Sequence, residues 1–172
     1  MRIELFQPSI EGEARILLLI DGFSGPKKSL EGRTKLAKLD FFLRYSSYFA
    51  KAMALRAGSA AYKSLLPEPE NIETSMIRYR YGPWDPAYYS ILGRLIGKGL
   101  IALSEYEKGV GYKSTELGET IAAKIKSEPT WAETGTKIEL LKRYLNLSGT
   151  RLKNFIYDNF PEITKAEWGA SL

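Results

Sequence analysis

The sequence predicts a mainly helical α+β fold with a small antiparallel β-sheet, and three observations support this class. Apolar residues recur at helical spacing over most of the chain, which is typical of amphipathic helices. Residues 100–106 and 112–114 are short β-prone runs, and the turn between them carries Gly109 and Gly111, which favours a hairpin. The chain has 172 residues, of which 44% are apolar, and this is enough to bury one core.

The helix that precedes this hairpin has clear start and stop signals. Asp85 is a typical N-cap residue, and Pro86 suits the first helical position because its missing N–H is not needed there. Gly99 can adopt the left-handed conformation that ends a helix, and Lys98 suits the negative end of the helix dipole. Between these signals, the apolar residues at helical spacing are Tyr88, Leu92, Leu95 and Ile96.

A further helix is expected after the hairpin, because Thr115 is a good N-cap residue and the helical pattern continues to Ile125. The order of helix, hairpin and helix is that of the latter half of a winged helix-turn-helix domain, with the hairpin as the wing. Upstream, residues 14–23, 34–44 and 48–57 are expected to form the preceding helices of this domain.

The second of these helices is expected to be amphipathic. Asp40 and Arg44 stand four residues apart, which is the spacing of a helical ion pair. Lys35, Lys38 and Arg44 are expected on the solvent side. The opposite, apolar face would consist of Leu36, Leu39, Phe42 and Leu43.

The middle of the chain contains a connector and a strand. Pro67 and Pro69 interrupt regular structure, so this segment is expected to be an exposed connector. Residues 74–81 then alternate between two sets of side chains, as a half-buried strand does. We expect this strand to be the third member of the wing sheet.

The C-terminal part extends beyond a minimal winged helix. Residues 136–147 and 150–160 are expected to form two antiparallel helices. The chain therefore divides into a winged-helix domain, residues 10–126, and a C-terminal helical hairpin and tail, residues 130–172, packed on it. Near the end of the tail, Trp168 either folds back onto the body or anchors a partner.

Composition excludes several function classes. The chain contains no histidine and no cysteine, so it cannot form a Ser-His-Asp or Cys-His nucleophile or the usual zinc sites. The acidic residues are scattered along the chain, and we expect them to be surface groups. No phosphate-binding glycine loop is present. We therefore expect no enzyme, no cofactor, no metal and no small-molecule substrate. No signal-peptide pattern or membrane span is evident, which favours a cytoplasmic protein without membrane contact.

The helix before the hairpin carries the candidate protein-docking face. A helix that reads DNA bases needs long polar side chains on its exposed face. Here that face is poor in such residues and contains two glycines, which let another backbone approach closely. Internal packing of the two glycines is the open alternative. The docking residues we expect, together with Trp168 of the tail, are Tyr89, Ser90, Gly93, Arg94 and Gly97.

The net charge of +5 keeps nucleic acid as a candidate partner, through contacts with phosphates. Such a basic surface forms only if the wing and the second helix lie on one side of the molecule. The alternative is that these lysines and arginines are ordinary solvated residues. The candidate residues for contact with the DNA backbone are Lys27, Lys28, Lys35, Lys38, Arg78, Arg80, Lys108 and Lys113.

Three segments carry a resemblance to a known family. They are residues 29–45, residues 81–85 (Tyr-Gly-Pro-Trp-Asp) and Leu117-Gly118 of the segment after the wing. In these segments the chain resembles the small middle component of three-component ABC-ATPase systems, among them the Lamassu-type antiphage defence systems of prokaryotes.

The resemblance implies a non-catalytic winged-helix accessory subunit. Such a subunit would dock on the heads of an SMC- or Rad50-like ATPase and link them to an effector, often a nuclease. The net positive charge separately makes the phosphates of double-stranded DNA a candidate contact. The competing hypothesis is a free-standing winged-helix transcriptional regulator that binds operator DNA.

Overall fold

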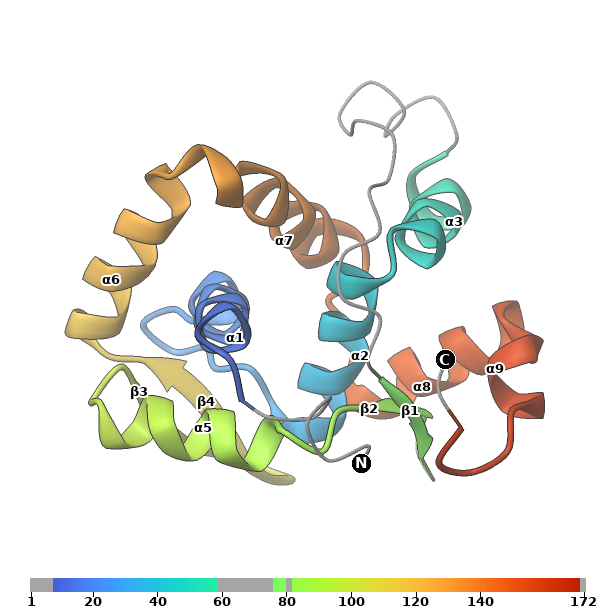
Figure 1. Cartoon of the computed structure of the whole chain (residues 1–172), viewed down its shortest axis with the longest axis horizontal. Coiled ribbons are helices and arrows are strands. Elements are labelled where there is room, and N and C mark those ends of the chain that lie inside the picture. The colour runs from blue at the N-terminus through green and yellow to red at the C-terminus, as the bar shows by residue number, and fades with distance from the viewer. Residues whose placement is uncertain (1–7, 59–75, 80–81, 171–172) are drawn as a thin grey trace.

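The computed structural model describes residues 8–58, 76–79 and 82–170. The predicted Pro67–Pro69 connector and Arg80 lie outside these residues. The fold is mainly helical α+β (Figure 1). Its elements are α1 (Ile10–Phe23), α2 (Gly32–Arg44), α3 (Ser46–Ala57), β1 (Ile77–Tyr79), β2 (Gly82–Trp84), α5 (Tyr88–Gly97), β3 (Ile101–Tyr106), β4 (Gly109–Ser114), α6 (Glu116–Ser127), the 3-10 helix η2 (Pro129–Trp131), α7 (Ala132–Tyr144), α8 (Gly149–Asn159) and α9 (Pro161–Lys165).

Helix α1 lies at the centre of one half of the molecule. It contacts α2, α5, α6, α7 and β4, which surround it in Figure 1. This explains its sequence, because a helix that is apolar on all sides must be buried on all sides. Residues 16–20 are at most 1% exposed, and the helix predicted over residues 14–23 is confirmed. Ser9 caps its start by accepting a hydrogen bond from the Gly12 amide at 3.0 Å.

Helix α2 is the second central element, and here the predicted solvent side is wrong. Lys35, Lys38 and Arg44 are only 6%, 1% and 2% exposed. The reason is that α8 and β2 cover the face that the charge pattern assigned to solvent. The helix thus contacts neighbours on every side and carries buried charges.

The hairpin is confirmed, with β3 and β4 antiparallel and Glu107 and Lys108 at its turn. The prediction that residues 74–81 add a third strand to it is wrong, because β1 pairs with β2 in a separate small sheet. Leu30 takes that place instead. Its backbone exchanges two hydrogen bonds with Tyr112 of β4, at 2.8 and 2.9 Å. Gly111 permits this approach, since a Cβ there would lie 2.7 Å from the Leu30 carbonyl oxygen.

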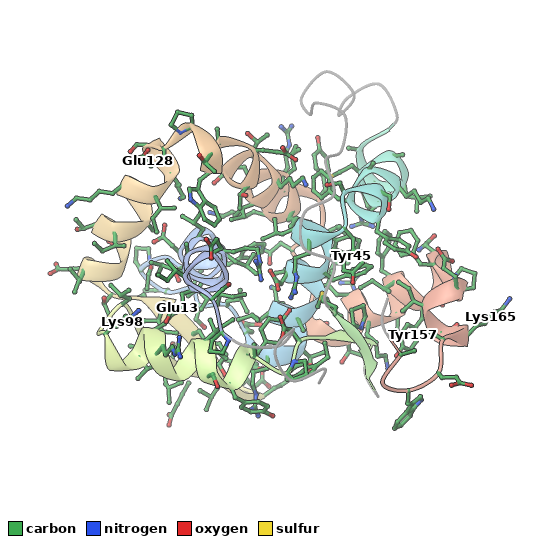
Figure 2. The ribbon with its side chains drawn as sticks, in the orientation of Figure 1. Glu13, Tyr45, Lys98, Glu128, Tyr157 and Lys165 are labelled. Atoms are coloured by element: carbon green, nitrogen blue, oxygen red, sulfur yellow. The ribbon has the colours of Figure 1, made fainter. Side chains whose placement is uncertain are left out.

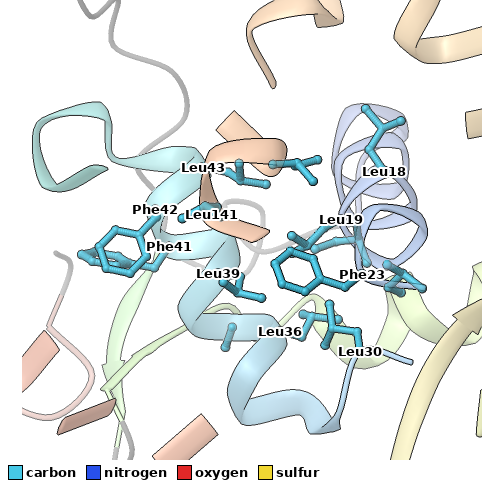
Figure 3. Packing of buried hydrophobic residues seen from close by; sticks show 14 of the residues in the cluster. Leu18, Leu19, Phe23, Leu30, Leu36, Leu39, Phe41, Phe42, Leu43 and Leu141 are labelled. Atoms are coloured by element: carbon cyan, nitrogen blue, oxygen red, sulfur yellow. The ribbon is translucent and has the colours of Figure 1, made fainter. Parts of the chain in front are cut away.

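The C-terminal helices form at the predicted places but do not pair with each other. Helix α7 packs against α1, α2 and α3, whereas α8 packs along α2 and against α9 and β2. Leu141 of α7 points into the same apolar cluster as Leu39 and Leu43 of α2 (Figure 3). The predicted helical hairpin is therefore wrong, because both helices cover α2 and share its core.

Helix α6 begins where the sequence indicates. The Thr115 hydroxyl accepts a hydrogen bond from the Gly118 amide at 3.0 Å, as an N-cap does. Among the described helices, none combines the length and apolar character that crossing a bilayer requires.

Candidate functional site

Helix α5 carries the candidate docking face, and its start is fixed by Asp85. The Oδ1 atom of Asp85 accepts a hydrogen bond from the Ala87 amide at 2.8 Å. The helix itself begins at Tyr88, two residues later than predicted, because Pro86 and Ala87 form a turn. Asp85 therefore acts as a cap for the turn that leads into the helix.

A buried network of charges holds this end of α5 against the core. Asp40 of α2 accepts hydrogen bonds from Arg15 Nε at 2.6 Å and from the Tyr88 hydroxyl at 2.7 Å. Arg44 lies 3.4 Å from Asp40 and 2.7 Å from Asp85. All five residues are at most 7% exposed. The predicted Asp40–Arg44 pair exists, but it is a buried link between α2 and the start of α5.

The network fixes the charge states of its members. Burial alone would raise the pKa of Asp40, but the neighbouring Arg15 and Arg44 guanidinium groups and the hydrogen bonds hold it below its ordinary value. Burial and the Asp40 carboxylate raise the pKa of Tyr88 well above its ordinary value. Tyr88 therefore stays protonated at neutral pH, and its hydroxyl donates a hydrogen bond to the charged Asp40 carboxylate. We interpret this network as a device that positions α5.

The other end of α5 is held by α1. Lys98 Nζ forms an ion pair with Glu13 at 3.0 Å, and the two residues lie side by side in Figure 2. Arg94 donates a hydrogen bond of 3.4 Å to the Pro8 carbonyl. Gly99 has a φ of +71°, so it forms the predicted left-handed end of the helix. The two longest polar side chains of α5 are thus directed to the region around the start of α1.

The face of α5 that points away from the core is open to solvent. We call this set the α5 face, and it consists of Tyr89, Ser90, Gly93, Arg94 and Gly97, all of which are exposed. A Cβ added to Gly93 or Gly97 would meet no atom of the described residues within 4 Å. The alternative of internal packing is therefore wrong for both glycines. Tyr89, at 60% exposed, is the largest side chain of this face.

Two apolar side chains of the hairpin are also exposed and were missed by the sequence analysis. Leu103 is 61% and Val110 46% exposed. In the register of β3 and β4, Leu103 stands opposite Tyr112 and Val110 opposite Glu105, so all four share one face of the hairpin. The alternating pattern of the strands places these residues on one face of the hairpin. The pattern does not show whether another element covers that face.

The predicted basic surface forms only in part. Lys27, Lys28 and Lys108 are exposed, whereas Lys113 is half-buried and donates a hydrogen bond to the Pro26 carbonyl at 3.2 Å. Arg80 lies outside the described residues, as does the side chain of Arg78. Of the predicted residues whose side chains the structure describes, three are therefore exposed: Lys27, Lys28 and Lys108.

The prediction that Lys35 and Lys38 contact DNA from the surface is wrong, because both side chains are buried between α2 and its neighbours. Lys35 Nζ donates a hydrogen bond to Asn146 Oδ1 at 2.7 Å. Burial, and secondarily the charge of Lys153, lower the pKa of Lys38 to about 7. Neither ammonium group is placed to reach a DNA phosphate from the surface.

Trp168 follows α9 and is 68% exposed, so it is not part of the buried core. That it folds back onto the body or anchors a partner stays a prediction. An exposed tryptophan is a large apolar surface that a partner could cover.

Within the described ranges, no group of three or more acidic side chains is placed to hold a metal ion. Comparison of the chain with protein-family models, with curated proteins and with solved structures gave no match.

Proposed function

We propose that this protein is a non-catalytic docking subunit that binds a partner protein through the α5 face. The observation that carries the proposal is the exposed pair Gly93 and Gly97 on a helix held at both ends. Each glycine weakens an exposed helix by about 1 kcal/mol relative to alanine. Neither glycine packs against a described residue of the monomer. Close approach of a second chain is a physical use for such a surface.

The resemblance supplies the identity of the partner in this proposal. The order of α5, the β3–β4 hairpin and α6 is compatible with a winged helix-turn-helix domain. The partner is then an SMC- or Rad50-like ABC ATPase of an antiphage defence system, with a nuclease-type effector as the third component. The exposed Leu103 and Val110 of the hairpin and Trp168 of the tail are further apolar surface for such contacts.

The competing hypothesis, a transcriptional regulator, has less support from the side chains of α5. Base reading requires long polar side chains that reach into the major groove. Arg94 and Lys98 are the longest on the helix, and both bond to groups at the start of α1. We therefore propose that any DNA contact is made to phosphates, with Lys27, Lys28 and Lys108 as the exposed residues of the predicted set.

A co-expression experiment with the open reading frames that flank this gene tests the docking proposal. Replacing both glycines of the α5 face by glutamine adds bulk to the surface, and glutamine is compatible with a helix. We expect the Gly93→Gln, Gly97→Gln variant to lose co-purification of the ATPase.

The matched control is Gly135→Gln in α7, another helical glycine whose added Cβ would meet no described atom within 4 Å. It should retain the ATPase. Equal retention by both variants, with unchanged circular dichroism, would show that the α5 face is not the docking surface.

A further inference from the structure

An open cleft of about 890 Å³ lies where the starts of α2 and α8 meet the tip of the hairpin. Its charged side chains come from all three places. Arg33 belongs to α2, Lys108 to the hairpin turn, and Arg151 and Lys153 to α8. Arg33 also stacks on the α5 face, because its Cζ atom lies 4.8 Å from the centre of the Tyr89 ring.

A smaller hollow of about 300 Å³ adjoins this cleft, since Glu31 and Ser148 line both. The smaller hollow contributes Lys27, Lys28 and the buried Lys35. Counted over the described residues, seven cationic and two acidic side chains line the two hollows. The surface is therefore strongly positive and extends over more than one depression.

The cations of the cleft differ in their partners from the five described cations that form ion pairs, which are Arg15, Arg44, Lys98, Lys126 and Lys137. Lys98, Lys126 and Lys137 each form an ion pair with a carboxylate within 4 Å. In the described part of the chain, no carboxylate lies within 4 Å of the charged groups of Arg33, Lys108, Arg151 or Lys153. The two carboxylates of the cleft, Glu31 and Glu107, offset only part of the charge of its four cations, and an anion in the cleft would relieve the remaining repulsion between them.

The backbone adds to the positive potential. Helices α2 and α8 both begin at the cleft, with Gly32 and Gly149 as their first residues. The two starts are close, because a Cβ on Gly149 would lie 3.2 Å from the backbone nitrogen of Lys35. No side chain caps the start of α2. The Gly32 amide bonds to the Leu30 carbonyl at 3.2 Å. The start of α8, in contrast, is capped by the Ser148 hydroxyl, which accepts a hydrogen bond from the Arg151 amide at 3.3 Å, so α2 has the less occupied of the two starts.

We propose that this cleft binds phosphate groups of a nucleic-acid backbone, with Arg33, Lys108, Arg151 and Lys153 as the phosphate-binding side chains. The inference rests on the proposed contact with DNA phosphates and gives it a site. A single nucleotide has the same phosphate chemistry. A row of phosphates fits better, because the cations continue through the adjoining hollow to Lys27 and Lys28. Three of these residues, Arg33, Arg151 and Lys153, were not among the sequence-predicted DNA contacts.

Titration of a labelled, mixed-sequence DNA duplex with the full chain tests the site. The double variant Arg151→Gln, Lys153→Gln removes two charges from the cleft. At about 0.1 M salt, counterion release predicts a loss of affinity of about tenfold for each phosphate contact removed. The slope of log K against log salt should fall by about two, and the loss should be the same for unrelated duplex sequences.

The matched control is Lys142→Gln, Arg143→Gln, which removes two exposed cations at the end of α7. Because Lys142 and Arg143 do not line the cleft, the control should bind nearly as tightly as the wild type. It has the same net charge as the cleft variant, so a difference between the two variants does not come from net charge. Equal losses in the two variants would refute the cleft as the site and leave a DNA contact elsewhere. Absence of duplex binding by the wild-type chain would refute both the site and the DNA contact.

A competition arm with ADP and inorganic phosphate separates the two sources of phosphate. Displacement of the duplex only at high competitor concentrations is expected for a polymer site. If the wild-type chain binds ADP more tightly than the duplex, and the cleft variant loses ADP binding, the site takes a small phosphorylated ligand and the nucleic-acid proposal is wrong.

Discussion

Lys38 is a buried charge that weakens the fold at neutral pH. It lies in α2, is 1% exposed, and has no hydrogen bond or ion pair with another described residue in the structure. Its ammonium group and the ring of Tyr157 both lie within 4 Å of the position that a Cβ on Gly82 would take. Burial, followed by the charge of Lys153, lowers the pKa of Lys38 from 10.5 to about 7.

The magnitude follows from this change in pKa. One pKa unit corresponds to about 1.4 kcal/mol, so the charged form of Lys38 costs the folded state on the order of 5 kcal/mol. Lys38→Met keeps the unbranched stem and removes the ammonium group. Because the side chain can relax partly in the wild type, we expect the free energy of unfolding to rise by about 2 to 4 kcal/mol at pH 7.

The pH dependence gives the sharper test. Between about pH 7 and the ordinary lysine pKa, the folded chain binds fewer protons at Lys38 than the unfolded chain. The contribution of Lys38 to stability therefore becomes less unfavourable as the pH rises through this window, and is constant below it. The gain from Lys38→Met should be largest below pH 7 and should shrink by about 1 kcal/mol per pH unit above it.

Urea unfolding followed by circular dichroism, at several pH values from about 6 to 9, measures this difference. Lys142→Met removes an exposed lysine of α7 and should change stability little at any pH. A gain from Lys38→Met that is the same at every pH, or a loss of stability, would refute the assignment of Lys38 as a buried, destabilising charge.

Two further predictions concern α5 and its supports. Tyr88→Phe should lower the free energy of unfolding by about 2 kcal/mol in urea titrations, because Asp40 loses a hydrogen bond to a charged oxygen. The pKa of Asp40 is below its ordinary value in the folded chain, so its stabilising contribution is present at neutral pH and is lost as the pH falls below about 4. Tyr88→Phe removes one of the hydrogen bonds that lower this pKa, so the loss should be complete at a higher pH. Gly93→Ala should raise the thermal midpoint, since its Cβ meets open space. Gly118→Ala should lower it, since its Cβ would collide with the Leu100 carbonyl. A lower midpoint for Gly93→Ala would contradict the exposed position of the α5 face.

Elements with local signals could be predicted from the sequence. The start of α6 depends on Thr115 and the end of α5 on Gly99, and both are short-range effects of one side chain or one backbone angle. The hairpin likewise follows from glycines near its turn. Helix α1 was recognisable because residues 16–20 are apolar without a break.

Properties set by distant segments could not be predicted in the same way. The alternation in residues 74–81 indicates a strand but does not identify its partner, which is β2 rather than the hairpin. Lys35 and Lys38 fit an amphipathic helix as well as a buried one. Only the packing of α8 on α2 decides between these, and that contact joins segments far apart in the chain.

The same distinction applies to the candidate sites. The α5 face is a helical face, so its five residues follow from the helical period once the helix is placed. The cleft joins Arg33, Lys108 and Arg151, which come from three separate elements. No local pattern connects these residues, so Lys108 was predicted as a DNA contact without its neighbours, and Arg33 and Arg151 were missed.

The buried charges and the exposed glycines of α5 have complementary effects. Glycines lower the intrinsic stability of the helix, and a loosely held helix would lose conformational entropy on binding a partner. The bond from Tyr88 to Asp40 and the ion pair of Lys98 with Glu13 hold the two ends of the helix against α2 and α1. The α5 face is thus ordered before any partner arrives, although its own sequence favours order only weakly. It follows that substitutions in α1 and α2, far from the surface, should weaken docking by loosening α5, even though they touch no partner.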